Sequence, residues 1–149
     1  ELTMSSDSLL PTLDDTTTPF WEGCKQHKLL IQRCVNSGRL IHPPRYNSPW
    51  HTTGELDWVE VSGRGKIWSV IEPHPPLTAQ FAALAPYNCV IVELDEDPTV
   101  RLAGNLIAST NSAINSISFD EISIGDAVRV VFQKEDDGLV MPRWVKSET

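Results

Sequence analysis

Alternation of apolar and polar residues dominates the second half of the chain and predicts a succession of short β-strands. The predicted strands lie within residues 56–71, 88–96, 99–107 and 126–145. Glycine, proline or aspartate marks the turns at 63–65, 97–98 and 136–138. The polar stretch 109–125 predicts a connection with a short helical turn. Five or six strands without alternating helices favour a small barrel or sandwich.

A different pattern precedes these strands. Residues 1–18 are rich in Ser, Thr and Asp, lack sustained periodicity and predict an extended arm. Thr18 as N-cap and Pro19 as the first helical residue predict a short helix, and the apolar run 29–34 predicts a strand. The predicted divisions are an arm at 1–18, a helix plus ribbon-like segment at 19–56, and a barrel domain at 57–149.

The segment CVNSGRLIHPPRYNSPWH has the spacing of a zinc ribbon, with two pairs of positions separated by ten residues. The four positions hold Cys34, Ser37, Ser48 and His51. Structural zinc is bound by thiolate and imidazole, and a serine hydroxyl does not ionise near neutral pH. We therefore expect a ribbon remnant without metal, held by packing and by hydrogen bonds from serine to the backbone. No helix N-terminus or basic side chain fixed beside Cys34 is recognisable that would lower its pKa, and Cys34 is expected to be a small buried apolar residue.

Charge and cysteine content narrow the classes of function. The 149 residues contain 12 basic and 20 acidic side chains, which gives a net charge of −8 and argues against a general affinity for nucleic acid. Three cysteines without a close pair predict a reducing, cytoplasmic location rather than a disulfide framework. No apolar run approaches the roughly 18 residues of a membrane span.

Several fragments, in this order and spacing, resemble a known family. They are PFWEG (19–23), GRLIHPPR (38–45), LDWVEVSGRGKIWSV (56–70), PYNCVIVELDE (86–96), GNL (104–106), IGDAVRVVF (124–132) and DDGLVMPRW (136–144). The chain resembles, from about residue 19 to 145, the acyl-CoA-associated proteins in which a rubredoxin-like zinc ribbon precedes an OB-fold. The resemblance implies a five-stranded OB-fold barrel, and the departure at the ribbon cysteines leaves that fold intact.

Proteins of this kind are usually non-catalytic small subunits. The resemblance implies a partner of the thiolase superfamily, either a thiolase, an acyltransferase or a lipid-transfer-protein-like aldolase of steroid side-chain degradation. It also implies a CoA thioester as the substrate of the complex and an α2β2 assembly. From its own residues we expect this chain to bind no cofactor. It leaves the reaction and the acyl group open.

Two sets of candidate residues follow from this interpretation. Large apolar side chains on a helix too short to form a core, and a proline-stiffened loop, predict partner docking through Phe20, Trp21, Pro73, His74, Pro75 and Pro76. The phosphates of CoA require cations. The candidate CoA contacts near glycines, prolines or strand ends are Arg39, Arg45, Arg64, Lys66 and Arg143.

Two alternatives stay open. An independent nucleic-acid-binding OB module would use Trp58, Trp68 and Phe81 as stacking platforms. A self-sufficient enzyme would use His74 or Asp95 as an acid–base group. The sequence contains no recognisable nucleophile–base grouping, phosphate-cradling glycine loop or metal cluster, so no catalytic residue is predicted.

Overall fold

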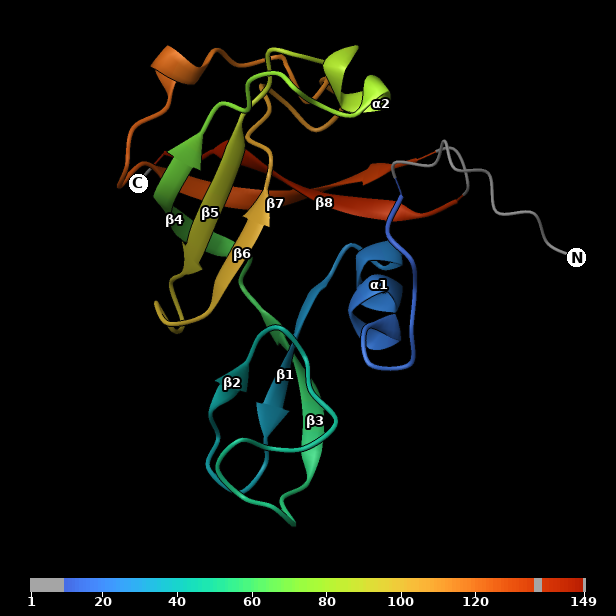
Figure 1. The fold of residues 1–149 in the computed structure, drawn as a ribbon. Coiled ribbons are helices and arrows are strands. Elements are labelled where there is room, and N and C mark those ends of the chain that lie inside the picture. The colour runs from blue at the N-terminus through green and yellow to red at the C-terminus, as the bar shows by residue number, and fades with distance from the viewer. Residues whose placement is uncertain (1–9, 136–137, 149) are drawn as a thin grey trace, which may run out of the picture.

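The computed structural model describes residues 10–135 and 138–148, and two sheets contain all the strands of that part (Figure 1). The smaller sheet has the order β2 (Leu40–Ile41), β1 (Leu29–Cys34), β3 (Leu56–Val61). The larger has the order β6 (Arg101–Gly104), β5 (Cys89–Leu94), β4 (Arg64–Ile71), β7 (Ala127–Lys134), β8 (Val140–Lys146). Helical segments are α1 (Thr18–Lys25), α2 (Ala79–Ala82) and the 3₁₀ turn η1 (Phe119–Glu121). The prediction of a mainly β chain with a short N-terminal helix is confirmed.

The helix α1 begins one residue earlier than predicted. Thr18 is its first helical residue and Thr17 occupies the cap position, without a side-chain cap. The preceding turn is held by Asp14, whose carboxylate accepts a hydrogen bond from the Thr17 amide at 2.9 Å. This turn lies in the described part of the predicted arm, whereas residues 1–9 lie outside the described residues. The helix packs against β1 and β8.

The three-stranded sheet is the ribbon. β1 pairs antiparallel with both β2 and β3, and Leu29 lies opposite Val61. Arg33 and Asp57 face each other across the β1–β3 pair and form an ion pair at 2.6 Å. β3 belongs to this sheet and spans the predicted division between residues 56 and 57.

The chain crosses from ribbon to barrel at Gly63, whose φ of +74° favours glycine. Its Cα lies against the Val130 side chain of β7, so a Cβ at this position would collide. The predicted turn at 63–65 is shorter than expected, because Gly65 lies inside β4 between β5 and β7.

The five-stranded sheet curls until its two edges meet. A shift of register between Ile67 and Ser69 bends β4 against β5. An isolated parallel bridge joins Leu106, just beyond β6, to Trp144 on β8. The Ile107 amide donates to the Trp144 carbonyl at 2.8 Å. This arrangement confirms the predicted five-stranded OB-fold barrel.

The connections of the barrel follow the predicted turn chemistry. Asp97 accepts a hydrogen bond from the Thr99 amide at 3.0 Å, in the turn of the β5–β6 hairpin. The 109–125 connection contains the predicted helical turn, η1, which Ser118 and Glu121 close as a capping box. In the β7–β8 hairpin, Asp136 and Asp137 lie outside the described residues.

One hydrophobic core joins barrel, ribbon and helix. Buried barrel residues such as Val92, Leu106 and Trp144 belong to the same cluster as Phe20 of α1 and Ile31 of β1. Burial of this continuous apolar surface holds the ribbon against the barrel. Within the described ranges, no helix is long and apolar enough to cross a membrane.

Candidate docking and ligand-contact surfaces

Two of the four ribbon positions, Cys34 and Ser48, are brought into direct contact. Cys34 ends β1 with no exposed surface, and Ser48 is also buried. The Ser48 hydroxyl donates a hydrogen bond to the Cys34 sulfur at 3.2 Å. The same oxygen accepts hydrogen bonds from the amides of Trp50 and His51, at 3.2 and 3.3 Å. The turns at 34–37 and 48–51 therefore meet at the Cys34–Ser48 contact.

The pKa of the Cys34 thiol differs from the prediction. Hydrogen bonds from the Ser37 and Ser48 side chains lower the pKa of its thiol to about 7, although burial opposes them. Cys34 is buried, as expected, but the lowered pKa of its thiol was not expected from the sequence. The cause is hydrogen bonding to the thiolate rather than a nearby positive charge.

The outer side of the two turns carries an aromatic contact. The Arg39 guanidinium lies 4.0 Å from the centre of the Trp50 ring, and His51 is exposed. In the part of the chain that the structure describes, no group of three or more His, Cys, Asp and Glu side chains could hold a metal ion. Two of the four positions offer hydroxyls, and that of Ser48 is already engaged with Cys34. This donor set does not fit structural zinc.

Phe20 and Trp21 lie differently from the predicted docking pair. Phe20 is 8% exposed and belongs to the core, and its ring meets Trp21 edge to face at 5.1 Å and His42 at 6.0 Å. As expected, α1 is too short to form a core of its own, but β1 and β8 complete a core around Phe20, which buries that side chain. Trp21 is half-buried and packs on the cluster from outside, so it remains partly accessible.

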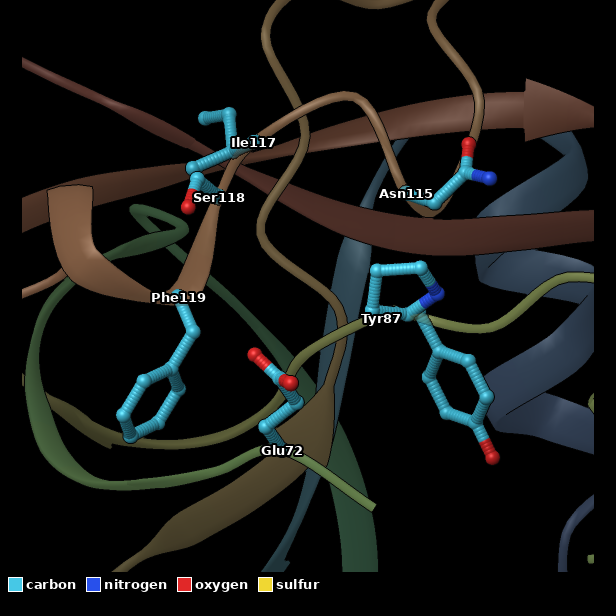
Figure 2. A pocket seen from close by; sticks show the side chains of 7 residues that line it. Glu72, Tyr87, Asn115, Ile117, Ser118 and Phe119 are labelled. Carbon is cyan, nitrogen blue, oxygen red and sulfur yellow. The ribbon is translucent and has the colours of Figure 1, made fainter. Parts of the chain in front are cut away.

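The proline-stiffened loop borders a cleft at the other end of the barrel, near α2. His74 is largely exposed, and its Nε2 lies 3.6 Å from the Glu72 carboxylate. A cleft of about 190 Å³ opens there, lined by Glu72, Pro86, Tyr87, Asn115, Ile117, Ser118 and Phe119 (Figure 2). In Figure 2 the Glu72 carboxylate lies between the rings of Phe119 and Tyr87. A carboxylate at this position disfavours a phosphate in the cleft.

The sequence did not indicate the residues that form this cleft with Glu72. Tyr87 and Phe119 are separated in the chain by strands β5 and β6 and by part of the 109–125 connection, and only the fold places them at one opening. Phe81 on α2 extends the aromatic surface, since its ring lies 5.7 Å from that of Tyr87. Phe81 and Phe119 are both about one-third exposed. The loop 73–76 thus adjoins a partly exposed aromatic rim.

The five candidate cations are scattered over the molecule. Arg39 and Arg45 are exposed on the ribbon, and Arg64 and Lys66 are exposed on one face of β4. In the barrel, Arg64 lies directly opposite Arg129 of β7. Sequence reasoning missed Arg129, because only the register of the β4–β7 pair places it beside Arg64.

Arg143 is not an exposed cation, contrary to expectation. Its guanidinium donates to the Asn105 side chain at 2.7 Å, to Gln133 at 3.3 Å and to Glu135 at 3.4 Å. Gln133 in turn donates to the carbonyls of Thr110 and Ser112. Arg143 therefore ties the start of the 109–125 connection to the sheet.

The residues of the two alternative functions do not form a common site. Trp58 packs against the core, whereas Trp68 is 43% exposed and lies under the Arg101 guanidinium at 3.8 Å. Asp95 is exposed at the end of β5, and its amide donates to the Arg64 carbonyl. Neither Asp95 nor His74 is paired with a nucleophile by the hydrogen bonds of the described residues.

Comparison with known proteins decides the family. Residues 58–133 match the C-terminal OB-fold domain of ChsH2, and residues 21–47 match the ChsH2 rubredoxin-like zinc ribbon domain. The chain belongs to the ChsH2 family. A chain of the solved Ltp2-ChsH2(DUF35) aldolase superposes with a TM-score of 0.73 at 30% sequence identity. The match covers 92% of this ChsH2-family chain and 98% of that chain.

Sequence relatives carry several names. A probable enoyl-CoA hydratase alpha subunit of Thermomonospora curvata is 36% identical over 83% of this chain and 35% of that protein. A DUF35 domain-containing scaffold protein of Methanothermobacter thermautotrophicus is 31% identical over 78% of this chain and 83% of that protein. A 3-oxo-4,17-pregnadiene-20-carboxyl-CoA hydratase alpha subunit of Mycobacterium tuberculosis is 35% identical over 64% of this chain and 29% of that protein. This ChsH2-family chain spans about a third of the length of the two hydratase subunits.

Proposed function

We propose that this chain is a non-catalytic accessory subunit of a thiolase-superfamily enzyme that acts on a CoA thioester. One observation carries the proposal: the match to the Ltp2-ChsH2(DUF35) aldolase covers nearly the whole length of both chains. That aldolase is named for two proteins, Ltp2 and ChsH2. A lipid-transfer-protein-like aldolase is therefore the first candidate partner, in an α2β2 assembly.

The arrangement of side chains agrees with an accessory role. No nucleophile–base pair emerges from the hydrogen bonds of the described residues, and we assign the chemistry to the partner. All three cysteines are free, which fits a reducing compartment such as the cytoplasm. The name of the mycobacterial relative contains a steroid-derived CoA thioester, and we extend the proposal to steroid side-chain degradation.

Docking is proposed to use Trp21 and the loop Pro73–Pro76 with its aromatic rim. Both offer partly exposed apolar surface, and aromatic anchors dominate the energy of many interfaces. Phe20 supports docking only indirectly, by holding Trp21 in place. The exposed Arg64 and Lys66, with Arg129 beside them, are the proposed contacts for CoA phosphates.

The test is co-expression with a lipid-transfer-protein-like aldolase, followed by size exclusion and an assay of CoA-thioester cleavage. We expect a stable complex whose activity requires this chain, and no turnover by the chain alone. Truncating Trp21 to alanine should weaken the complex by about 2 kcal/mol. Tyr46→Ala is the matched control, since Tyr46 is 78% exposed on the ribbon and outside the proposed docking surface.

An isolated monomer beside an equally active aldolase would reject the proposal. Turnover of a CoA thioester by this chain alone would also reject it. A hydratase partner is the second candidate, because two relatives are named as hydratase alpha subunits. Stable binding to a hydratase subunit, and none to the aldolase, would select that candidate.

A further inference from the structure

The two ribbon turns place backbone amides near the side chain of their first position. In the first turn the backbone of Asn36 and Ser37, two and three residues further along, contributes to lowering the pKa of the Cys34 thiol. The Ser48 hydroxyl accepts from the amides of Trp50 and His51, also two and three residues further along. In the second turn a pair of backbone amides is thus directed at the side chain of the first position, and the lowered pKa of Cys34 indicates a similar influence of the backbone in the first turn.

This backbone suits an anionic sulfur at both first positions. Amides that converge on one atom favour a negative charge there, as they do on a metal-bound thiolate. In the second turn they converge on a neutral hydroxyl, which uses its proton to bond Cys34 at 3.2 Å. The bond crosses between the two turns, where a ribbon with four thiols would place its metal.

We propose that the Ser48–Cys34 hydrogen bond replaces zinc as the cross-link of this ribbon, and that the backbone still has the geometry of a metal site. The ribbon then folds without metal, supported by Ser37 beside Cys34 and by the stacking of Arg39 on Trp50. Restoring thiols at Ser37, Ser48 and His51 should recreate a tetrahedral zinc site. This inference does not depend on the proposed partner.

The first experiment measures zinc content and thermal stability of the full chain, with and without EDTA, after expression in zinc-supplemented medium. The unaltered chain should contain well under one zinc per molecule and should melt at the same temperature with chelator. The variant S37C/S48C/H51C should bind close to one zinc per molecule and should melt at lower temperature with chelator. Adding Cys34→Ser to that variant should abolish its zinc binding.

A second measurement keeps the proposal testable if the three-cysteine variant does not fold. Ser48→Ala in the otherwise unaltered chain removes the cross-link and leaves the amides of the second turn without an acceptor. Its melting temperature should fall by about 4 °C or more, equally with and without chelator. Ser123→Ala, a change at an exposed serine in the 109–125 connection, is the control and should have little effect.

Three results would overturn the inference. The first is stoichiometric zinc in the unaltered chain that Cys34→Ser removes. The second is a folded three-cysteine variant that binds no metal. The third is a Ser48→Ala variant whose melting temperature equals that of the Ser123→Ala control.

Discussion

Asn88 pairs with Leu106 through its side-chain amide, in the way that one strand residue pairs with another. The Asn88 Nδ2 donates to the Leu106 carbonyl at 2.9 Å, and its Oδ1 accepts from the Leu106 amide at 2.7 Å. Asn88 is 1% exposed, so water cannot substitute for it. Leu106 forms the bridge to Trp144, and Asn88 thus holds the segment that closes the barrel.

Replacing Asn88 by leucine should therefore destabilise the barrel by about 2–4 kcal/mol, because two buried backbone groups lose their partners. Urea unfolding followed by tryptophan fluorescence measures this free energy. Asn111→Leu, at an exposed position, is the control and should change stability by less than about 0.5 kcal/mol. Equal midpoints for the two variants would contradict the closing role of Asn88.

Phe20→Ala should destabilise the isolated chain by about 3 kcal/mol, because it empties a core position shared by helix, ribbon and barrel. Phe119→Ala removes a ring that is 37% exposed and should cost less than about 1 kcal/mol. Urea midpoints of the two variants without partner provide the comparison. If Phe20→Ala left stability unchanged and weakened only the complex, Phe20 would be a docking residue as the sequence suggested.

Gly65→Ala should cost about 2–3 kcal/mol through overpacking inside β4. A Cβ there would collide with the Glu93 carbonyl and approach the Val92 side chain at 2.6 Å. Gly138→Ala is the control, since a Cβ at Gly138 meets no atom within 4 Å. Its only cost is the strain of an alanine at a φ of +76°, about 1 kcal/mol. In thermal melts the Gly65→Ala variant should have a lower melting temperature than the Gly138→Ala variant. The reverse order would contradict the close β4–β5 contact.

His42 should make stability depend on pH. Burial lowers the pKa of His42 in the folded chain, so the unfolded chain binds the proton more readily. Stability should then rise with pH through about 6.5, the value for an unfolded histidine, and fall as the solution is acidified below it. Urea midpoints between pH 5 and 7.5 should show this slope, and His42→Gln should reduce it. An unchanged slope in His42→Gln would assign the effect to other groups.

Nucleic acid should bind weakly at about 0.15 M salt, because the chain carries 20 acidic against 12 basic side chains. Arg101 already covers the ring of Trp68, the most exposed of the three candidate stacking residues. Fluorescence anisotropy with labelled single- and double-stranded oligonucleotides measures the affinity. Micromolar binding that weakens steeply with salt, and that Trp68→Ala abolishes, would instead favour the OB module as a nucleic-acid binder.

Local chemistry made much of the fold predictable. The helix begins within one residue of the predicted cap, since Pro19 suits only a first turn. The hairpin of β5 and β6 follows the break at Asp97, and the 109–125 connection contains its expected helical turn. Each of these features depends on neighbours in the chain.

The candidate sites were less predictable, because they depend on which side chains the fold buries. Phe20 and Trp21 are adjacent and both apolar, yet Phe20 enters the core while Trp21 stays half-exposed. Arg143 follows a proline near the end of the chain, like an exposed cation, but lies against partners from two other segments, Asn105 after β6 and Gln133 and Glu135 at the end of β7. The exposure of a side chain depends on which residues pack against it in the folded chain. Its neighbours in sequence do not specify those residues.

The sequence by itself determined β1, the strands from residue 56 onward, the short helix, the OB-fold resemblance and the spacing of the two ribbon turns. Only the tertiary structure decided that β3 pairs with β1 while β4 enters the barrel, and that Arg64 faces Arg129. It also decided that Ser48 bonds the sulfur of Cys34. The physical reason is that periodicity reports which face of a strand is apolar, whereas strand pairing and register are settled by contacts between residues distant in the chain.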